Sequence, residues 1–98
     1  MSKVFISGAI KNQPDFNRAA FYRAEMMLTK QGHAVMNPVK LHPEDPSLFD
    51  PSEYIHVCLA MIDICDMVYF LDGWEKSVGS RQEFQYAMEK HKQFDFEV

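Results

Sequence analysis

Apolar residues occur in this chain as strand-length runs separated by stretches with helical spacing. The segments Lys3–Ser7, His33–Pro38 and Met67–Leu71 have the length of short strands. The last of them is apolar at every position, which is typical of a strand covered on both faces in a parallel sheet. The tail Gln93–Val98 instead alternates apolar and polar residues. One face of that strand should meet solvent, so we expect it at a sheet edge or in an interface.

Three stretches between these strands have apolar residues at three- and four-residue spacing, which predicts amphipathic helices. The first should begin at Pro14, which suits the first helical position, and end before Gly32. The second should run from Asp50 to Ile64, because Asp50-Pro51-Ser52-Glu53 fits a capping box. The stripes expected to face the core are Phe16, Ala19, Ala20, Arg23, Ala24 and Met27, then Ile55, Cys58, Leu59 and Ile62, then Phe84, Ala87, Met88 and His91.

This order of elements predicts a three-layer α/β domain. Strands and helices alternate along the chain, which is the pattern of a parallel sheet sandwiched by helices. We therefore expect residues 1–98 to form one minimal Rossmann-like or flavodoxin-like domain with a mostly parallel sheet of about four strands. The segment from Val39 to Phe49 contains Pro43 and Pro46 and should be a surface loop, long enough for a lid or an interface.

Composition and charge exclude several classes of function. The hydrophobic fraction of 47% is that of a globular protein. The net charge of −4, without a cluster of basic residues, argues against binding to duplex nucleic acid. Nowhere do about eighteen apolar residues run together, so we expect a soluble, cytoplasmic protein with no membrane partner. A core of this size buries only about two thirds of the unfolded surface, so a homo-oligomer is expected, a dimer or a dimer of dimers.

Cysteines and histidines show no spacing typical of metal ligands or redox pairs. Cys58 and Cys65 are separated by about 10 Å along one predicted helix, too far for an easy disulfide, and buried small side chains are the favoured interpretation. The first loop lacks the Gly-x-Gly-x-x-Gly fingerprint, so a dinucleotide cofactor is not supported. The four histidines are scattered: His33, His42, His56 and His91.

The candidate site is the loop from Leu71 to Glu83, between the third strand and the third helix. In open α/β sheets, ligands bind beyond the carboxyl ends of the strands, where a helix start offers free N–H groups to an anion. Two interpretations of Glu83 stay open. It is either a functional residue of the ligand site or the glutamate of a capping box, because Ser80-Arg81-Gln82-Glu83 also fits that motif. Ser77 and Gly79 likewise fit ordinary turn chemistry. The small-residue turn Gly8–Asn12 is the second expected wall of the site.

Four segments together resemble the nucleoside 2-deoxyribosyltransferase superfamily, and within it a branch of small bacterial and phage proteins with the same Gly-Trp-Glu-x-Ser loop. They are Phe5-Ile6-Ser7-Gly8-Ala9-Ile10, Asn37-Pro38, Cys65-Asp66 and Gly73-Trp74-Glu75-Lys76-Ser77-x-Gly-x-x-x-Glu83. The resemblance implies that Glu83 is the nucleophile that attacks the anomeric carbon of a 2-deoxyribonucleoside, with no metal or organic cofactor. It implies substrate contacts at Gly8, Ala9, Ile10, Lys11, Asn37, Trp74, Ser77, Gly79 and Ser80.

Three positions depart from the pattern of the transferases. Phe5 stands where relatives have a tyrosine that orients the nucleophile, and Cys58 stands where they have an aspartate. Ser77 stands where the transferases have a second aspartate, whereas the deoxynucleoside 5′-phosphate N-hydrolases of the same superfamily have a phosphate-binding serine. Phosphate recognition by Ser77, the Gly79 N–H and Lys11 is therefore expected over recognition of a free nucleoside, although a lone lysine is more often a solvated surface residue.

Three functions from different classes follow. The first is an N-glycosidase or 2-deoxyribosyltransferase that acts on a deoxynucleoside 5′-phosphate through Glu83. The second is a nucleotide-binding or sensing module without turnover, which the replacements at Phe5 and Cys58 favour. The third and weakest is a structural subunit whose loop only caps a helix.

Overall fold

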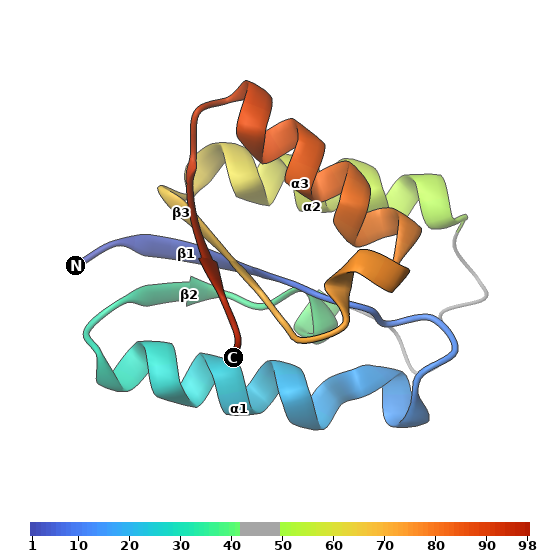
Figure 1. The fold of residues 1–98 in the computed structure, drawn as a ribbon, viewed down its shortest axis with the longest axis horizontal. Helices are drawn as coiled ribbons and strands as arrows, with labels where there is room; N and C mark the ends of the chain where they lie inside the picture. Colours follow the sequence, from blue (N-terminus) through green and yellow to red (C-terminus); the bar gives the residue numbers. More distant parts are fainter. Residues whose placement is uncertain (42–49) are drawn as a thin grey trace.

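The protein is built on one four-stranded sheet with helices on both faces, as Figure 1 shows. The computed structural model describes residues 1–41 and 50–98. Its elements are β1 (Lys3–Ser7), η1 (Pro14–Asn17), α1 (Arg18–Lys30), β2 (Ala34–Met36), η2 (Pro38–Leu41), α2 (Pro51–Ile64), β3 (Met67–Phe70), η4 (Trp74–Lys76), α3 (Val78–Glu89) and β4 (Gln93–Phe96), where η marks a 3-10 turn.

All neighbouring strands are parallel, in the spatial order β2-β1-β3-β4. Phe5 of β1 lies beside Met36 of β2 and Val68 of β3, and Ser7 lies beside Phe70. The predicted parallel α/β fold is therefore confirmed. The chain leaves β1 toward one edge of the sheet and later returns to its other side, so the carboxyl ends of β1 and β3 flank a topological switch point.

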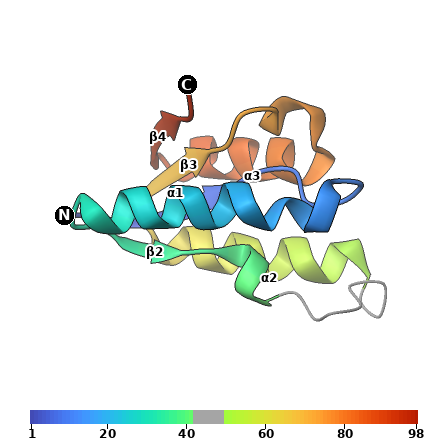
Figure 2. The same cartoon turned by 90° about the horizontal axis from the view of Figure 1, so that it is seen from below.

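Each face of the sheet has its own apolar core. Helix α1 covers one face and helices α2 and α3 cover the other (Figures 1 and 2). Alternate side chains of β1 and β3 point into the two layers, as expected for buried strands. The α1 side contains Val4, Ile6, Phe21, Ala24, Leu28, Val39, Tyr69 and Leu71, and the other side contains Phe5, Cys58, Met61, Ile62, Cys65, Val68, Phe70 and Ala87.

The first helix begins at Arg18, so the predicted start at Pro14 is wrong. Asp15, Phe16 and Asn17 have left-handed backbone conformations, with φ values of 49°, 56° and 61°. These dihedrals interrupt helical hydrogen bonding, and aspartate and asparagine tolerate them better than most residues. The Asn17 amide also donates to the Ala9 carbonyl at 3.0 Å, which ties this turn to the loop after β1.

The buried face of α1 is rotated relative to the predicted stripe. Phe21 and Leu28 are fully buried beside Ala24, whereas Arg23 and Met27 are exposed. Ala19 is also exposed and Phe16 lies outside the helix, so only Ala20 and Ala24 of the predicted stripe pack into the core. The observed face follows Phe21, Ala24 and Leu28, which lie three and four residues apart and therefore share one side of the helix.

The buried face of α3 is partly polar, which the apolar pattern could not indicate. Ser80, Glu83 and Ala87 point inward, whereas Met88 is 45% exposed. His91 lies beyond the helix with φ of 59° and is exposed. The predicted stripe through Met88 and His91 is therefore wrong. Ser80 and Glu83, which were not part of the predicted stripe, are buried on the inner face beside Ala87.

The predicted capping box and buried cysteines are confirmed, whereas the predicted surface loop is wrong at Val39. The Glu53 carboxylate accepts the Asp50 N–H at 2.8 Å, as a capping box requires, and both cysteines are free and buried. Val39 is buried in η2 and does not belong to a surface loop. The remainder of that predicted loop, residues 42–49 with Pro43 and Pro46, lies outside the described residues.

Strand β4 lies at the sheet edge, as predicted from its alternation. On this strand the Asp95 carboxylate accepts the N–H of Phe96 at 2.9 Å. Across residues 1–41 and 50–98, no helix is both long and apolar enough to cross a membrane.

Candidate active site

Glu83 places a buried carboxylate at the switch point between β1 and β3. The side chain comes from α3 and is 7% exposed. The Ser7 hydroxyl, at the carboxyl end of β1, donates to Glu83 Oε1 at 2.6 Å, and the Cys58 thiol of α2 also donates to this carboxylate. None of the ion pairs among the described residues includes Glu83. Two neutral donors from two elements therefore hold a carboxylate that no cation compensates.

This environment changes the ionisation of both groups. Burial raises the pKa of Glu83 from 4.5 to about 7, while the hydrogen bonds from Ser7 and Cys58 act in the opposite direction. Burial, with the neighbouring Glu83 charge, raises the pKa of the Cys58 thiol far above its ordinary value. Cys58 thus stays a protonated donor, while Glu83 changes charge near neutral pH. Such perturbed groups cluster at functional sites, although structural networks produce them too.

Helix α3 is capped by Ser77 and not by Ser80. The Ser77 hydroxyl oxygen accepts the Ser80 N–H at 3.2 Å, and the Ser77 backbone is extended, as an N-cap residue should be. Ser80 lies inside the helix and is buried. The capping-box interpretation of Ser80 and Glu83 is therefore wrong.

Ser7 is the member of this site that the sequence analysis did not assign. Phe5, for which the resemblance to the transferases implied an orienting tyrosine, packs into the apolar layer under α2 and α3. Ser7 lies two residues farther along β1 and supplies a hydroxyl to Glu83. A polar residue at the carboxyl end of an otherwise apolar strand was the available signal, because that end faces the ligand crevice in open α/β sheets.

The loops after β1 and β3 are held together at Gly8. A Cβ atom on Gly8 would lie 2.7 Å from Leu71 Cδ1, closer than side-chain atoms pack. The Leu71 N–H donates to the Ser7 carbonyl at 2.8 Å, which joins the two strand ends directly. Glycine at this position is therefore explained by the packing of β1 against β3. Its predicted substrate contact stays a prediction.

The start of α3 offers donors toward the same end of the sheet. Val78 and Gly79 lie in the first helical turn, where N–H groups have no intrahelical acceptor. A Cβ on Gly79 would meet only Ser77 Oγ, at 3.9 Å, so the space beside this residue is open. Lys11 is exposed and makes no ion pair within the described part of the chain. Phosphate binding by Ser77, Gly79 and Lys11 stays a prediction, as do contacts from Ala9 and Ile10.

Asn37 already has structural partners for its side chain. Its amide donates to Glu25 Oε1 at 2.9 Å, and its Oδ1 atom accepts the Val39 N–H at 3.1 Å. The residue is 4% exposed. These bonds explain a buried asparagine at the end of β2 without a ligand, and the predicted substrate contact rests on the resemblance alone.

Trp74 belongs to an aromatic cluster at the β4 edge. Its ring stacks on Phe84 at a centroid distance of 5.0 Å and lies 4.8 Å from Phe70. Phe94 and Phe96 of β4 complete this cluster. The structure thus brings Ser7, Ser77, Ser80 and Glu83 together with Cys58. It gives Trp74 packing partners outside that group.

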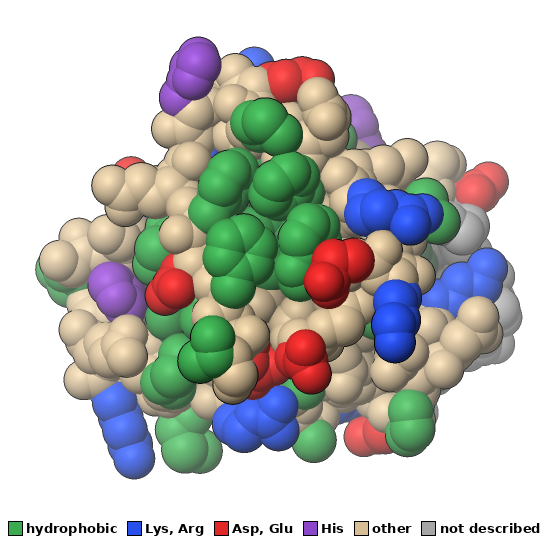
Figure 3. Space-filling model, in the orientation of Figure 1, with side chains coloured by type: hydrophobic (Ala, Val, Ile, Leu, Met, Phe, Trp, Pro, Cys, Tyr) green, Lys and Arg blue, Asp and Glu red, His purple; other side chains and the backbone are tan. Residues whose placement is uncertain are grey.

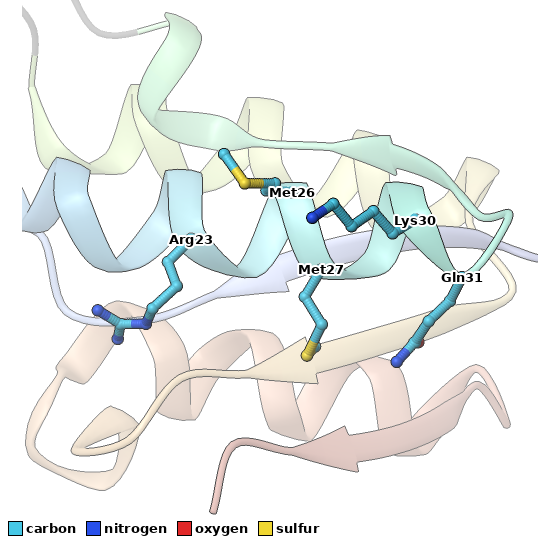
Figure 4. A pocket seen from close by; sticks show the side chains of 5 residues that line it. All are labelled: Arg23, Met26, Met27, Lys30 and Gln31. Atoms are coloured by element: carbon cyan, nitrogen blue, oxygen red, sulfur yellow. The ribbon is translucent and has the colours of Figure 1, made fainter.

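A surface hollow on α1 is separate from this site. Figure 4 shows its lining side chains diverging from the outer surface of the helix. Helix α1 covers the sheet face opposite to α2 and α3, so the hollow cannot serve Glu83. In residues 1–41 and 50–98, no group of three metal-binding side chains could hold an ion. The hollow is lined by Arg23, Met26, Met27, Lys30 and Gln31.

Comparison with protein families gives a match over nearly the whole chain. The family described as "Domain of unknown function (DUF4406)" matches residues 2–95. The chain belongs to this family. No curated protein matches the sequence. The DUF4406 description names no activity.

Proposed function

We propose that this DUF4406 protein is an N-glycosidase or 2-deoxyribosyltransferase that cleaves the N-glycosidic bond of a deoxynucleoside 5′-phosphate, with Glu83 as the nucleophile. The observation that carries the proposal is the buried Glu83 carboxylate, which Ser7 holds at 2.6 Å beside the switch point of the sheet. Its sequence context is the similarity to the nucleoside 2-deoxyribosyltransferase superfamily described above.

The chemistry suits a carboxylate that is buried without a cation. Attack by a Glu83 oxygen on the anomeric carbon forms a C–O bond, while the base leaves with the electrons of the C–N bond and takes up a proton. The product of this step is a neutral ester. Because burial disfavours the charged carboxylate, it favours conversion to the uncharged ester. Water or a second base then attacks the same carbon and restores the free carboxylate.

The start of α3 supports a substrate with a phosphate group. The Ser77 oxygen uses a lone pair to accept the Ser80 N–H, so the Ser77 proton is available to a phosphate oxygen. The first-turn N–H groups and the helix dipole favour an anion at the same point. A phosphate held there would place the sugar of the substrate near the carboxyl end of β1.

A binding module without turnover is the second candidate. It is favoured by the low exposure of Glu83, 7%, because a nucleophile must reach its substrate. The polar group Ser7, Ser80 and Glu83 would then serve to hold α3 against β1. Such a module would bind a nucleotide and leave it intact.

Base release separates these candidates. The protein is incubated with deoxynucleosides and their 5′-monophosphates, and free base is followed by chromatography. We expect release from a monophosphate by the wild type, and a loss on the order of a thousandfold or more in Glu83→Gln. Glu75→Gln is the matched control, because Glu75 is exposed in η4. Saturable binding without release would favour the module, and release by Glu83→Gln at the wild-type rate would contradict the nucleophile.

A further inference from the structure

Three oxygen atoms form a continuous hydrogen-bonded line inside the site. Ser80 Oγ lies 3.1 Å from Ser7 Oγ, which in turn lies 2.6 Å from Glu83 Oε1. Ser7 and Ser80 are 0% and 1% exposed. Within the described structure their hydroxyl groups bond to each other, and Ser7 also bonds to Glu83. The two serines come from different elements, β1 and α3.

The protons of this line can be assigned by counting donors. A serine hydroxyl has one proton and two lone pairs. The short bond to a charged Glu83 takes the Ser7 proton, so the Ser80 hydroxyl must donate to Ser7. If Glu83 is protonated, its O–H can donate to Ser7, and Ser7 then donates to Ser80. Both hydrogen bonds of the line therefore persist in the two charge states with their directions reversed, and in the protonated state the Ser80 proton is the one that the line does not use.

We propose that Ser7 and Ser80 form a reversible hydroxyl relay that positions Glu83 in its charged, protonated and esterified states. In the ester the carbonyl oxygen still accepts from Ser7, so the positioning bond persists through the reaction. The relay itself rests on the geometry, and its catalytic role rests on the proposed function. Ser7 acts through Glu83 and is a positioning residue.

Few other groups face the carboxylate. Cys58 is the titratable neighbour from α2, and its thiol is a weak hydrogen-bonding group. No charged side chain of the described residues contributes to the ionisation of Glu83. Changes at Ser7 and Ser80 can therefore be followed through Glu83 without interference from a second ion.

Carbon-13 NMR of side-chain carboxyl groups tests the relay without a substrate. The Glu83 resonance is assigned by its loss in Glu83→Gln, and its pH midpoint is compared in Ser7→Ala, Ser7→Thr and Ser80→Ala. We expect Ser7→Ala to raise the midpoint by about one pH unit, because the bond it removes is stronger to the charged form of Glu83 than to the protonated form. Ser80→Ala should raise it by less, and Ser7→Thr should restore it. Ser52→Ala, on the exposed side of α2, is the control.

The outcomes separate this inference from the proposed function. In an active wild type, Ser7→Ala should lower kcat by about ten- to a hundredfold with little change in KM, and the pH of half-maximal kcat should follow the NMR midpoint. Unchanged midpoints in Ser7→Ala and Ser80→Ala would overturn the relay. A shift in Ser7→Ala alone would also overturn it, since Ser80 would then take no part. Absence of base release would defeat the proposed function, and the NMR comparison would still decide the relay.

Discussion

The side chain of Glu83 meets two opposing requirements. The proposed role as a nucleophile requires an anion, whereas burial raises the pKa of this carboxyl to about 7. The hydrogen bonds from Ser7 and Cys58 favour the anion and keep the pKa from rising further. Glu83 therefore becomes charged near neutral pH while remaining in a dry environment.

The pH dependence of activity follows from this ionisation. We predict that base release rises with pH through a midpoint near 7, because only the charged form of Glu83 can attack. Initial rates at saturating substrate, measured between about pH 5 and 8, check this. A rate that is constant over that range would show that ionisation of Glu83 does not limit the reaction.

The same pKa makes folding stability depend on pH. Between 4.5 and about 7 the folded chain binds more protons at Glu83 than the unfolded chain does. Stability therefore falls as the pH rises through this window and is constant beyond it. At about 1.4 kcal/mol per pH unit, the free energy of unfolding falls by about 3 kcal/mol across this window.

Glu83→Gln should remove this loss, because glutamine stays neutral and still accepts the Ser7 hydrogen bond. We predict that the variant is more stable than the wild type by up to about 3 kcal/mol at pH 8, and that this advantage is absent near pH 4. Urea unfolding at both values measures it. Glu75→Gln should show no such change, and a Glu83→Gln variant that is less stable at pH 8 would contradict the argument.

At the scale of elements, two glycines near the site have opposite surroundings. Gly8 lies against Leu71 where β1 meets β3, whereas Gly79 has open space in the first turn of α3. We predict that Gly8→Ala lowers the free energy of unfolding by about 1–3 kcal/mol through overpacking. Gly79→Ala should raise it by up to about 1 kcal/mol, since alanine is the better helix former. Denaturant unfolding compares the pair, and equal effects would refute the assignment.

Several elements could be predicted because their signals are local. The apolar strand β3 and the capping box of α2 depend on neighbouring residues, and both are confirmed. The left-handed turn before α1 depends on the Asn17 bond to Ala9, and the sequence pattern contains no trace of that contact. The start of α1 was wrong for this reason.

The candidate site likewise has one part with a local sequence signal and one part that depends on long-range contacts. Glu83 was identified through a loop pattern, which is local in the sequence. Its hydrogen bond to Ser7 joins residues 76 positions apart, and only the packing of α3 against the sheet beside β1 brings them together. The inward faces of Ser80 and Glu83 were missed because apolar periodicity cannot report a polar residue that is buried.

At the scale of the whole molecule, the β4 edge carries an apolar surface. Figure 3 shows hydrophobic side chains gathered in the middle of this face, with acidic and basic side chains around them. The aromatic cluster of Phe70, Trp74, Phe84, Phe94 and Phe96 lies at this edge, and Phe96 is 42% exposed. Patches of this kind often mark protein interfaces.

We predict that the protein forms a homo-oligomer, with the β4 face and α2 as candidate interface elements. Sedimentation equilibrium at micromolar concentration should show a species heavier than 11.4 kDa. Phe96→Lys should weaken the assembly if this face is the interface, because it brings a charge into an apolar contact. Met26→Lys is the control, since Met26 is 62% exposed on α1. A wild type that sediments only at 11.4 kDa would contradict the prediction.

The hydrogen bond between Asp95 and Phe96 bears on how such an assembly can grow. The N–H groups of Gln93 and Glu97 point into the sheet, so by alternation the Phe96 N–H faces the open edge. The Asp95 carboxylate occupies this donor at 2.9 Å. An incoming strand would have to displace the Asp95 carboxylate before it could pair with the Phe96 N–H. At this position of the open edge, the backbone therefore disfavours pairing with a strand of another copy.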